Sequence, residues 1–201
     1  MCVSRIRSVG SKDRCGHDPV KKALIGGIGN VLLGDDGVGP YMIRLLESMY
    51  TFDENVEIAD LGTPALDLTH RIAGLHSLIL VDSVIRSDPH GDDHPGTVLL
   101  YRKQDLLQQV PAPRFDPHSP ALSECLMTAA MLGACPVNAL LVGVVGESYE
   151  PGASLSAAVR ETVGQAIDAI LRELRRLGFA FRKKPVPDEP RIWWSPDHIH
   201  V

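Results

Sequence analysis

Apolar runs and amphipathic segments alternate along most of the 201-residue chain. The apolar runs have the length and aliphatic composition of buried strands, and they cover residues 23–28, 56–59, 77–81 and 139–145. The segments between and after them carry apolar residues at helical spacing, at residues 37–50, 64–73, 119–132 and 154–177. Strands that alternate with helices indicate a mostly parallel sheet with helices on both faces. The pattern therefore predicts an α/β fold.

One further strand is expected to run in the opposite direction. Residues 97–102 are rich in β-branched and aliphatic side chains, and a polar stretch of turn-forming residues, 83–96, joins them to the strand before. A parallel crossover normally needs a helix, whereas neighbouring antiparallel strands need only a turn or loop. We therefore expect residues 97–102 to form an antiparallel strand at the edge of the sheet.

The length of the chain suits one domain, because most domains contain about 50 to 250 residues. We expect residues 1–20 to be a flexible leader, residues 21–182 a single α/β domain, and residues 183–201 a proline-rich tail. The N-terminal stretch is basic and polar and lacks an apolar signal core, which argues against export.

Composition excludes several classes of partner. The net charge is −5, from 20 Lys and Arg against 25 Asp and Glu, which provides no footprint for a nucleic-acid backbone. No window reaches the roughly 18 uninterrupted apolar residues of a membrane helix. The four cysteines show neither a CxxC pair nor zinc-ribbon spacing. Reduced thiols, and hence a cytoplasmic protein, are the expectation.

Three aspartates follow or end the first three expected strands. Asp36 lies in the loop after the first strand, Asp60 ends the second and Asp82 ends the third. Right-handed crossovers bring the carboxyl ends of parallel strands to one edge of a sheet, where open α/β sheets bind their ligands. The sequence therefore predicts that these carboxylates gather at that edge.

The glycine-rich turn at residues 26–30 leaves a dinucleotide-binding alternative open. That fingerprint needs a third glycine at the start of the helix, where this chain has Leu32. Asp35 and Asp36 would also repel a diphosphate at the helix N-terminus. One of the two aspartates is expected to cap that helix. The other is then a candidate ligand or catalytic group.

Six motifs in order resemble those of the nickel–iron hydrogenase maturation endopeptidases. The first is GIGNVLLGDDGVGP at residues 27–40, and the spacing fits from about residue 23 to about residue 177. The other five are ADLGTPALDL (59–68), LILVDSV (78–84), HPGTVLL (94–100), PHSPAL (117–122) and LVGVVGESYEPGASLSAAV (141–159).

The resemblance implies a fold and an activity. Members of this family have a twisted five-stranded sheet between helices, which here means a three-layer αβα sandwich. They remove a C-terminal extension from the precursor of the hydrogenase large subunit after nickel insertion. That precursor is the expected partner. The metal-contacting residues of the family map onto Asp36, Asp60 and His118, which are also the expected catalytic residues.

Two carboxylates and one imidazole suit a borderline divalent ion such as nickel, for which zinc or cadmium could substitute. The absence of a thiolate predicts modest, exchangeable binding, as expected of an enzyme that inspects nickel brought by the precursor. Alternatives remain open: Asp60 could cap the second helix, and His118 could be an ordinary loop histidine. A non-catalytic nickel-sensing chaperone would need the same three residues, and a nucleotide-dependent oxidoreductase is the third possibility.

Overall fold

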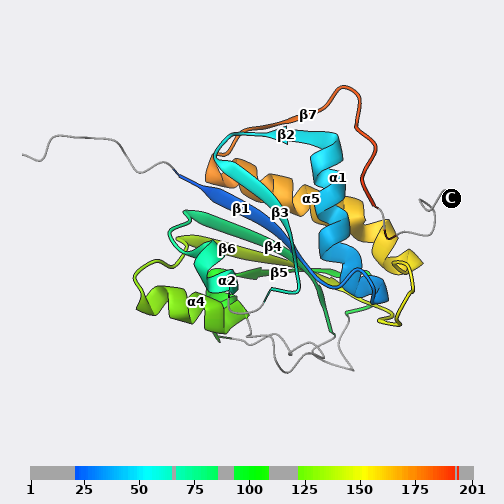
Figure 1. Cartoon of the computed structure of the whole chain (residues 1–201), viewed down its shortest axis with the longest axis horizontal. Helices are drawn as coiled ribbons and strands as arrows, with labels where there is room; N and C mark the ends of the chain where they lie inside the picture. The colour runs from blue at the N-terminus through cyan, green and yellow to red at the C-terminus, as the bar shows by residue number, and fades with distance from the viewer. Residues whose placement is uncertain (1–20, 65–66, 86–92, 109–121, 193, 195–201) are drawn as a thin grey trace, which may run out of the picture.

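A five-stranded sheet forms the middle layer of the molecule (Figure 1). The computed structural model describes residues 21–64, 67–85, 93–108, 122–192 and 194. The strand order is β3-β1-β4-β6-β5, with β1 at Ala23–Ile28, β3 at Val56–Gly62, β4 at Ser77–Val84, β5 at Val98–Arg102 and β6 at Asn138–Val145. Strand β5 is antiparallel to β6 at the edge, and the other pairs are parallel. The mostly parallel sheet with one antiparallel edge strand is confirmed.

Helices cover both faces of this sheet, which confirms the three layers. Helices α1 (Val38–Met49) and α5 (Ala157–Leu177) pack on one face. Helices α2 (Asp67–Ile72), α3 (Lys103–Gln108) and α4 (Leu122–Met131) contribute to the core on the other. Successive side chains of a strand point to opposite faces of the sheet. On β4, Ile79 and Val81 therefore face α1 and α5, whereas Leu78 and Leu80 face the other helical layer. None of the helices in the described ranges combines the length and apolar character needed to cross a membrane.

Two strands extend beyond the ends that the sequence predicts. Strand β3 continues to Gly62 and β4 to Val84, so Asp60 and Asp82 lie within strands rather than after them. The cause is long-range pairing, because Asp60 is in register with Gly27 of β1, and Asp82 with Gly143 of β6. Aspartate has a low intrinsic strand preference, which neighbouring strands override.

A second, two-stranded sheet ties the C-terminal part of the domain to the end of α1. Strand β2 (Tyr50–Phe52) pairs antiparallel with β7 (Phe181–Lys183). Beyond β7, the backbone N–H of Lys184 donates to Met49 and that of Asp188 donates to Ser48. Residues 184–192, which we name the C-terminal strap, therefore run along α1 and end with the buried Ile192.

Candidate active site

Glycines allow α1 to pack directly against the backbone of β1. A methyl group at Gly27 would collide with the carbonyl of Gly39, and one at Gly39 would collide with the carbonyl of Ile28. These two glycines, which we name the glycine seam, therefore serve helix–strand packing. The amide of Asn30, in the turn that follows β1, donates to the carboxylate of Asp36. The hydrogen bond counts against the dinucleotide alternative, because this loop amide already donates to a carboxylate and is not available to a phosphate.

Asp36 is fixed where β1 and β4 end. It lies in a single 3-10 turn, η1 (Gly34–Gly37), immediately before α1. Its Oδ2 accepts the backbone N–H of Asn30 at 2.7 Å, and its Oδ1 accepts the hydroxyl of Ser83 on β4 at 2.9 Å. Asp36 is only 8% exposed. This carboxylate is thus held in one orientation by donors from two strand ends.

The neighbouring Asp35 has a structural role. It is fully buried, and its carboxylate accepts the backbone N–H groups of Glu147, Ser148 and Ser156 at 2.7, 3.0 and 2.6 Å. Ser156 is the N-cap of α5, so one side chain fixes both the loop after β6 and the start of α5. The prediction that one of the two aspartates caps the first helix is wrong. Its N-cap is Gly37, without a side-chain hydrogen bond.

Asp60 lies near the end of β3 and is less confined. Its Oδ1 accepts the backbone N–H of Gly62 at 3.0 Å, and its Oδ2 lies 3.3 Å from Nη2 of Arg44 on α1. The side chain of Asp60 is 24% exposed. The alternative that Asp60 caps the second helix is not supported by its contacts. Helix α2 begins at Asp67, whereas the carboxylate of Asp60 contacts β3 and α1.

Asp36 and Asp60 lie at the same edge and on the same face of the sheet. Asp60 is in register with Gly27, and a Cβ added at Gly27 would point into α1. Asp36 immediately precedes α1 and accepts a hydrogen bond from Ser83 on β4. Asp82 has the opposite orientation, because side chains alternate along β4 and Ser83 faces the α1 layer. The edge predicted from topology therefore separates into two faces, with Asp36 and Asp60 together on one of them.

The third predicted residue, His118, lies outside the described residues. Within the ranges that the structure describes, no group of three or more His, Cys, Asp or Glu side chains could hold a metal ion. The predicted ligand set has only two members there. Each carboxylate has about four lone-pair positions, so Asp36 and Asp60 could each accept a metal bond besides the hydrogen bonds described above. Their donor type fits a borderline divalent ion, and their role as ligands remains a prediction.

Two neighbours of these aspartates were not predicted from the sequence. Ser83 orients Asp36, and Arg44 contacts both Asp60 and Glu47. The spacing of Arg44 and Glu47 on one helix is a visible signal of an ion pair. The contact with Asp60 depends on how α1 lies across β3, which no local pattern encodes.

Known proteins resemble this chain over most of its length. The model of the hydrogenase maturation protease family HycI matches residues 40–173. The hydrogenase 2 maturation protease of Escherichia coli (strain K12) is 31% identical over 160 residues, which cover 78% of this chain and 93% of that protein. The hydrogenase expression/formation protein HoxM of Azotobacter vinelandii is 33% identical and covers 77% of this chain and 73% of its own length. The solved structure of the E. coli hydrogenase maturating endopeptidase HybD superposes with a TM-score of 0.73 at 29% identity, over 81% of this chain and 98% of that one.

Proposed function

This chain belongs to the hydrogenase maturation protease family and is an endopeptidase, and we propose that it removes the C-terminal extension of a nickel-loaded hydrogenase large-subunit precursor. Proteases of this family act on hydrogenase large-subunit precursors in general. The proposal adds that nickel is the element by which this enzyme recognises a precursor ready for cleavage. It also has the enzyme act in the cytoplasm, as the cysteine usage of the chain suggests.

In this proposal Asp36, Asp60 and His118 complete the coordination of nickel that the precursor carries on its own ligands. The observation that carries the proposal is the arrangement of Asp36 and Asp60. Both are oriented by hydrogen bonds from the backbone at the carboxyl edge of the sheet, on one face. Open α/β sheets bind their ligands at this edge. Zinc or cadmium would substitute for nickel, because both accept oxygen and nitrogen donors.

Cleavage then needs a water molecule, a base and a polarised peptide carbonyl. Asp60 is the more exposed of the two carboxylates and is therefore the better placed to accept a proton from the attacking water. The oxygen of that water forms a bond to the carbonyl carbon, the peptide C–N bond breaks, and the leaving amine takes the proton. The divalent ion would supply polarisation of the carbonyl when the precursor is bound. This is aspartic-type chemistry assisted by a metal that the substrate brings.

The experiment is a processing assay with purified precursor, with and without nickel, in which intact mass reports cleavage. Asp36→Asn, Asp60→Asn and His118→Ala are each expected to lower the rate by about 100-fold or more, as removal of one group that stabilises a transition state does. Glu57→Gln is the matched control, because Glu57 is also an acidic residue of β3 but pairs with Arg71 at the surface. Its rate should equal that of the wild type.

Full processing by all three variants would contradict the assignment of these residues. A complex with the precursor that forms without any change in mass would instead indicate the non-catalytic chaperone. Circular dichroism of each variant establishes that a loss of processing does not reflect unfolding.

A further inference from the structure

Arg44 divides its guanidinium group between two carboxylates. Nη1 lies 3.1 Å from Glu47, one turn further along α1, and Nη2 lies 3.3 Å from Asp60. The side chains of Arg44 and Asp60 are 28% and 24% exposed. The Nε–H of Arg44 is buried and finds no acceptor in the described part of the chain. Arg44 is therefore only partly satisfied where it stands.

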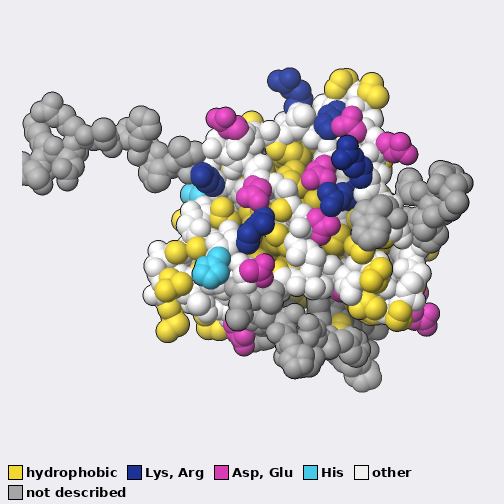
Figure 2. Space-filling view, in the orientation of Figure 1, with side chains coloured by type: hydrophobic (Ala, Val, Ile, Leu, Met, Phe, Trp, Pro, Cys, Tyr) yellow, Lys and Arg dark blue, Asp and Glu magenta, His cyan; other side chains and the backbone are white. Residues whose placement is uncertain are grey.

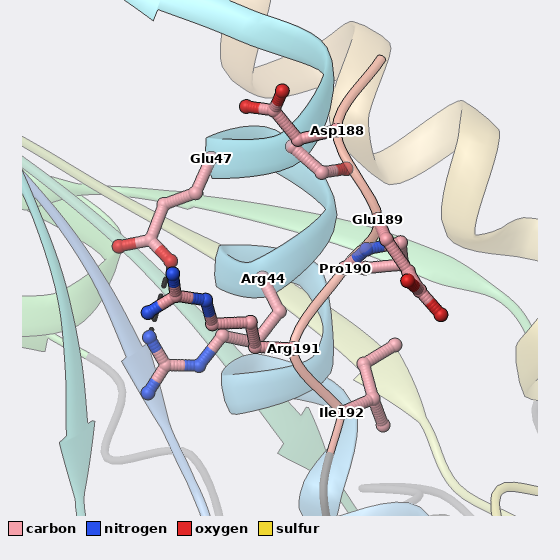
Figure 3. Close-up of a pocket in the computed structure, with 8 residues that line it drawn as sticks. Arg44, Glu47, Asp188, Glu189, Pro190, Arg191 and Ile192 are labelled. Atoms are coloured by element: carbon pink, nitrogen blue, oxygen red, sulfur yellow. Dashed lines mark hydrogen bonds and ion pairs between the residues drawn. The ribbon is translucent and has the colours of Figure 1, made fainter. Parts of the chain in front are cut away.

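A groove of about 850 Å³ opens beside this side chain (Figure 3). Arg44, Glu47 and Ser48 of α1 line one wall, and residues 188–192 of the C-terminal strap line the other. Figure 3 shows the guanidinium groups of Arg44 and Arg191 reaching toward the same end of the groove, near Glu47. On the same face, basic and acidic side chains alternate over the surface (Figure 2).

The groove contains acidic side chains that are alternative ion-pair partners for Arg44. Glu47 already contacts Arg44, and Asp188 and Glu189 add negative charge on the opposite wall. Asp188 is engaged by Lys184 at 2.6 Å, and in Figure 3 the carboxylate of Glu189 points away from the Arg44 guanidinium, which leaves Glu47 as the partner that can hold it. An arginine that moved off Asp60 into the groove would remain paired.

A divalent ion on Asp60 and a guanidinium on the same carboxylate would repel each other. Partly exposed ion pairs of this kind are weak, so the contact between Arg44 and Asp60 can be broken readily. The contact between Arg44 and Glu47 need not break at the same time. Arg44 therefore keeps Glu47 as a partner if its contact with Asp60 breaks.

We propose that Arg44 is a displaceable counter-ion of Asp60, which moves into the groove when the nickel-bearing precursor docks. Arg44 is then a positioning and specificity-determining residue. It neutralises Asp60 in the free enzyme and disfavours capture of a free divalent ion, whereas nickel held by precursor ligands displaces it. This inference rests on the proposed role of Asp60 in contacting nickel.

The test is a calorimetric titration of the purified full chain with nickel ions alone. Arg44→Gln is expected to bind nickel about two- to five-fold more tightly than the wild type, which is the range that exposed ion pairs provide. Glu47→Gln is expected to bind nickel more weakly by a similar factor, because Arg44 then has only Asp60. Arg71→Gln, which removes a comparable pair with Glu57 on β3, is the matched control and should leave the affinity unchanged.

The double variant Arg44→Gln/Glu47→Gln decides whether Glu47 acts through Arg44. It should bind nickel as tightly as Arg44→Gln alone, because Glu47 has no influence once its arginine is gone. Independent effects that simply add would overturn the inference. So would an unchanged or weakened affinity in Arg44→Gln, which is what a purely structural arginine gives.

Processing assays and nickel titrations of the same variants separate the role of Arg44 from the role of Asp60. If Asp60→Asn blocks processing while the variants at positions 44 and 47 leave nickel affinity unchanged, only the counter-ion role is wrong. If Asp60→Asn processes the precursor at the wild-type rate, the role of Asp60 itself is wrong, and the inference about Arg44 falls with it.

Discussion

Helices α5 and α1 cover the same face of the sheet but hold their carboxylates in different ways. At the start of α5, Asp35 accepts three backbone N–H groups without any exposed surface. Near its end, Glu173 is 5% exposed and contacts both Arg102 and Arg176. At α1, Asp60 is partly exposed, accepts one backbone N–H from Gly62 and shares Arg44 with Glu47. The carboxylates of Asp35 and Glu173, which fasten α5, are saturated with hydrogen-bond donors. The carboxylate of Asp60, beside α1, keeps capacity for another ligand.

The pKa of Glu173 reflects this saturation. The hydrogen bond from Arg176 holds the pKa of Glu173 below its usual value, against the opposing effect of burial, and Arg102 adds to the lowering. Because the two arginines come from α5 and from the edge strand β5, this cluster joins helix to sheet. The surroundings of an acidic residue, rather than its presence, therefore indicate whether it fastens the fold or is available for chemistry.

The largest effect on stability is expected for Asp35→Asn. An amide offers one acceptor oxygen and turns an NH2 group toward N–H donors, so at least one backbone N–H loses its partner in a buried site. The free energy of unfolding should fall by about 3–5 kcal/mol, since hydrogen bonds to a charged group contribute about 1.5–3 kcal/mol each. Urea unfolding monitored by circular dichroism measures this. A loss below about 1 kcal/mol would show that Asp35 does not fasten α5.

Glu173→Gln is expected to lower the free energy of unfolding by a smaller amount, about 1–3 kcal/mol, because both arginines remain half-exposed to water. Processing of the precursor should be retained. Asp60→Asn should show the reverse, with a change in stability below about 1 kcal/mol and loss of processing. If both substitutions changed stability and activity alike, the distinction between the two helices would not hold.

The smallest effect is confined to acid. Since the pKa of Glu173 is lowered in the folded state, its ionised form stabilises the fold fully above the unfolded-state pKa, near 4.5. That contribution is lost as the pH falls through the lower, folded-state pKa. The stability difference between wild type and Glu173→Gln should therefore be constant above pH 4.5 and shrink below it. Urea unfolding at a series of pH values measures this, and a difference that grows in acid would contradict the assignment.

Much of the fold follows from local pattern. The aliphatic run at residues 23–28 has the bounds of β1, and the turn-rich stretch before residues 97–102 correctly indicated an antiparallel edge strand. Strands β2 and β7 were not predicted, because three residues carry too little periodicity. Their pairing also joins positions more than a hundred residues apart, such as Tyr50 and Lys183.

The site was less accessible to sequence reasoning than the fold. Topology indicated correctly that Asp36 and Asp60 lie at one edge, because parallel strands present their carboxyl ends together. The division of labour between Asp35 and Asp36 was not visible, since the partners of Asp35 lie 112 to 121 positions further along the chain. The role of His118 stays a prediction.

The glycine seam has a consequence for altering the enzyme. Because α1 meets β1 through backbone atoms at Gly27 and Gly39, no side chain can be trimmed or exchanged there to shift the helix. The position of α1 relative to β1, and of Arg44 on α1, is consequently set by main-chain contacts. Efforts to retarget the enzyme to another precursor should leave the glycine seam unchanged and vary the C-terminal strap, which forms one wall of the groove.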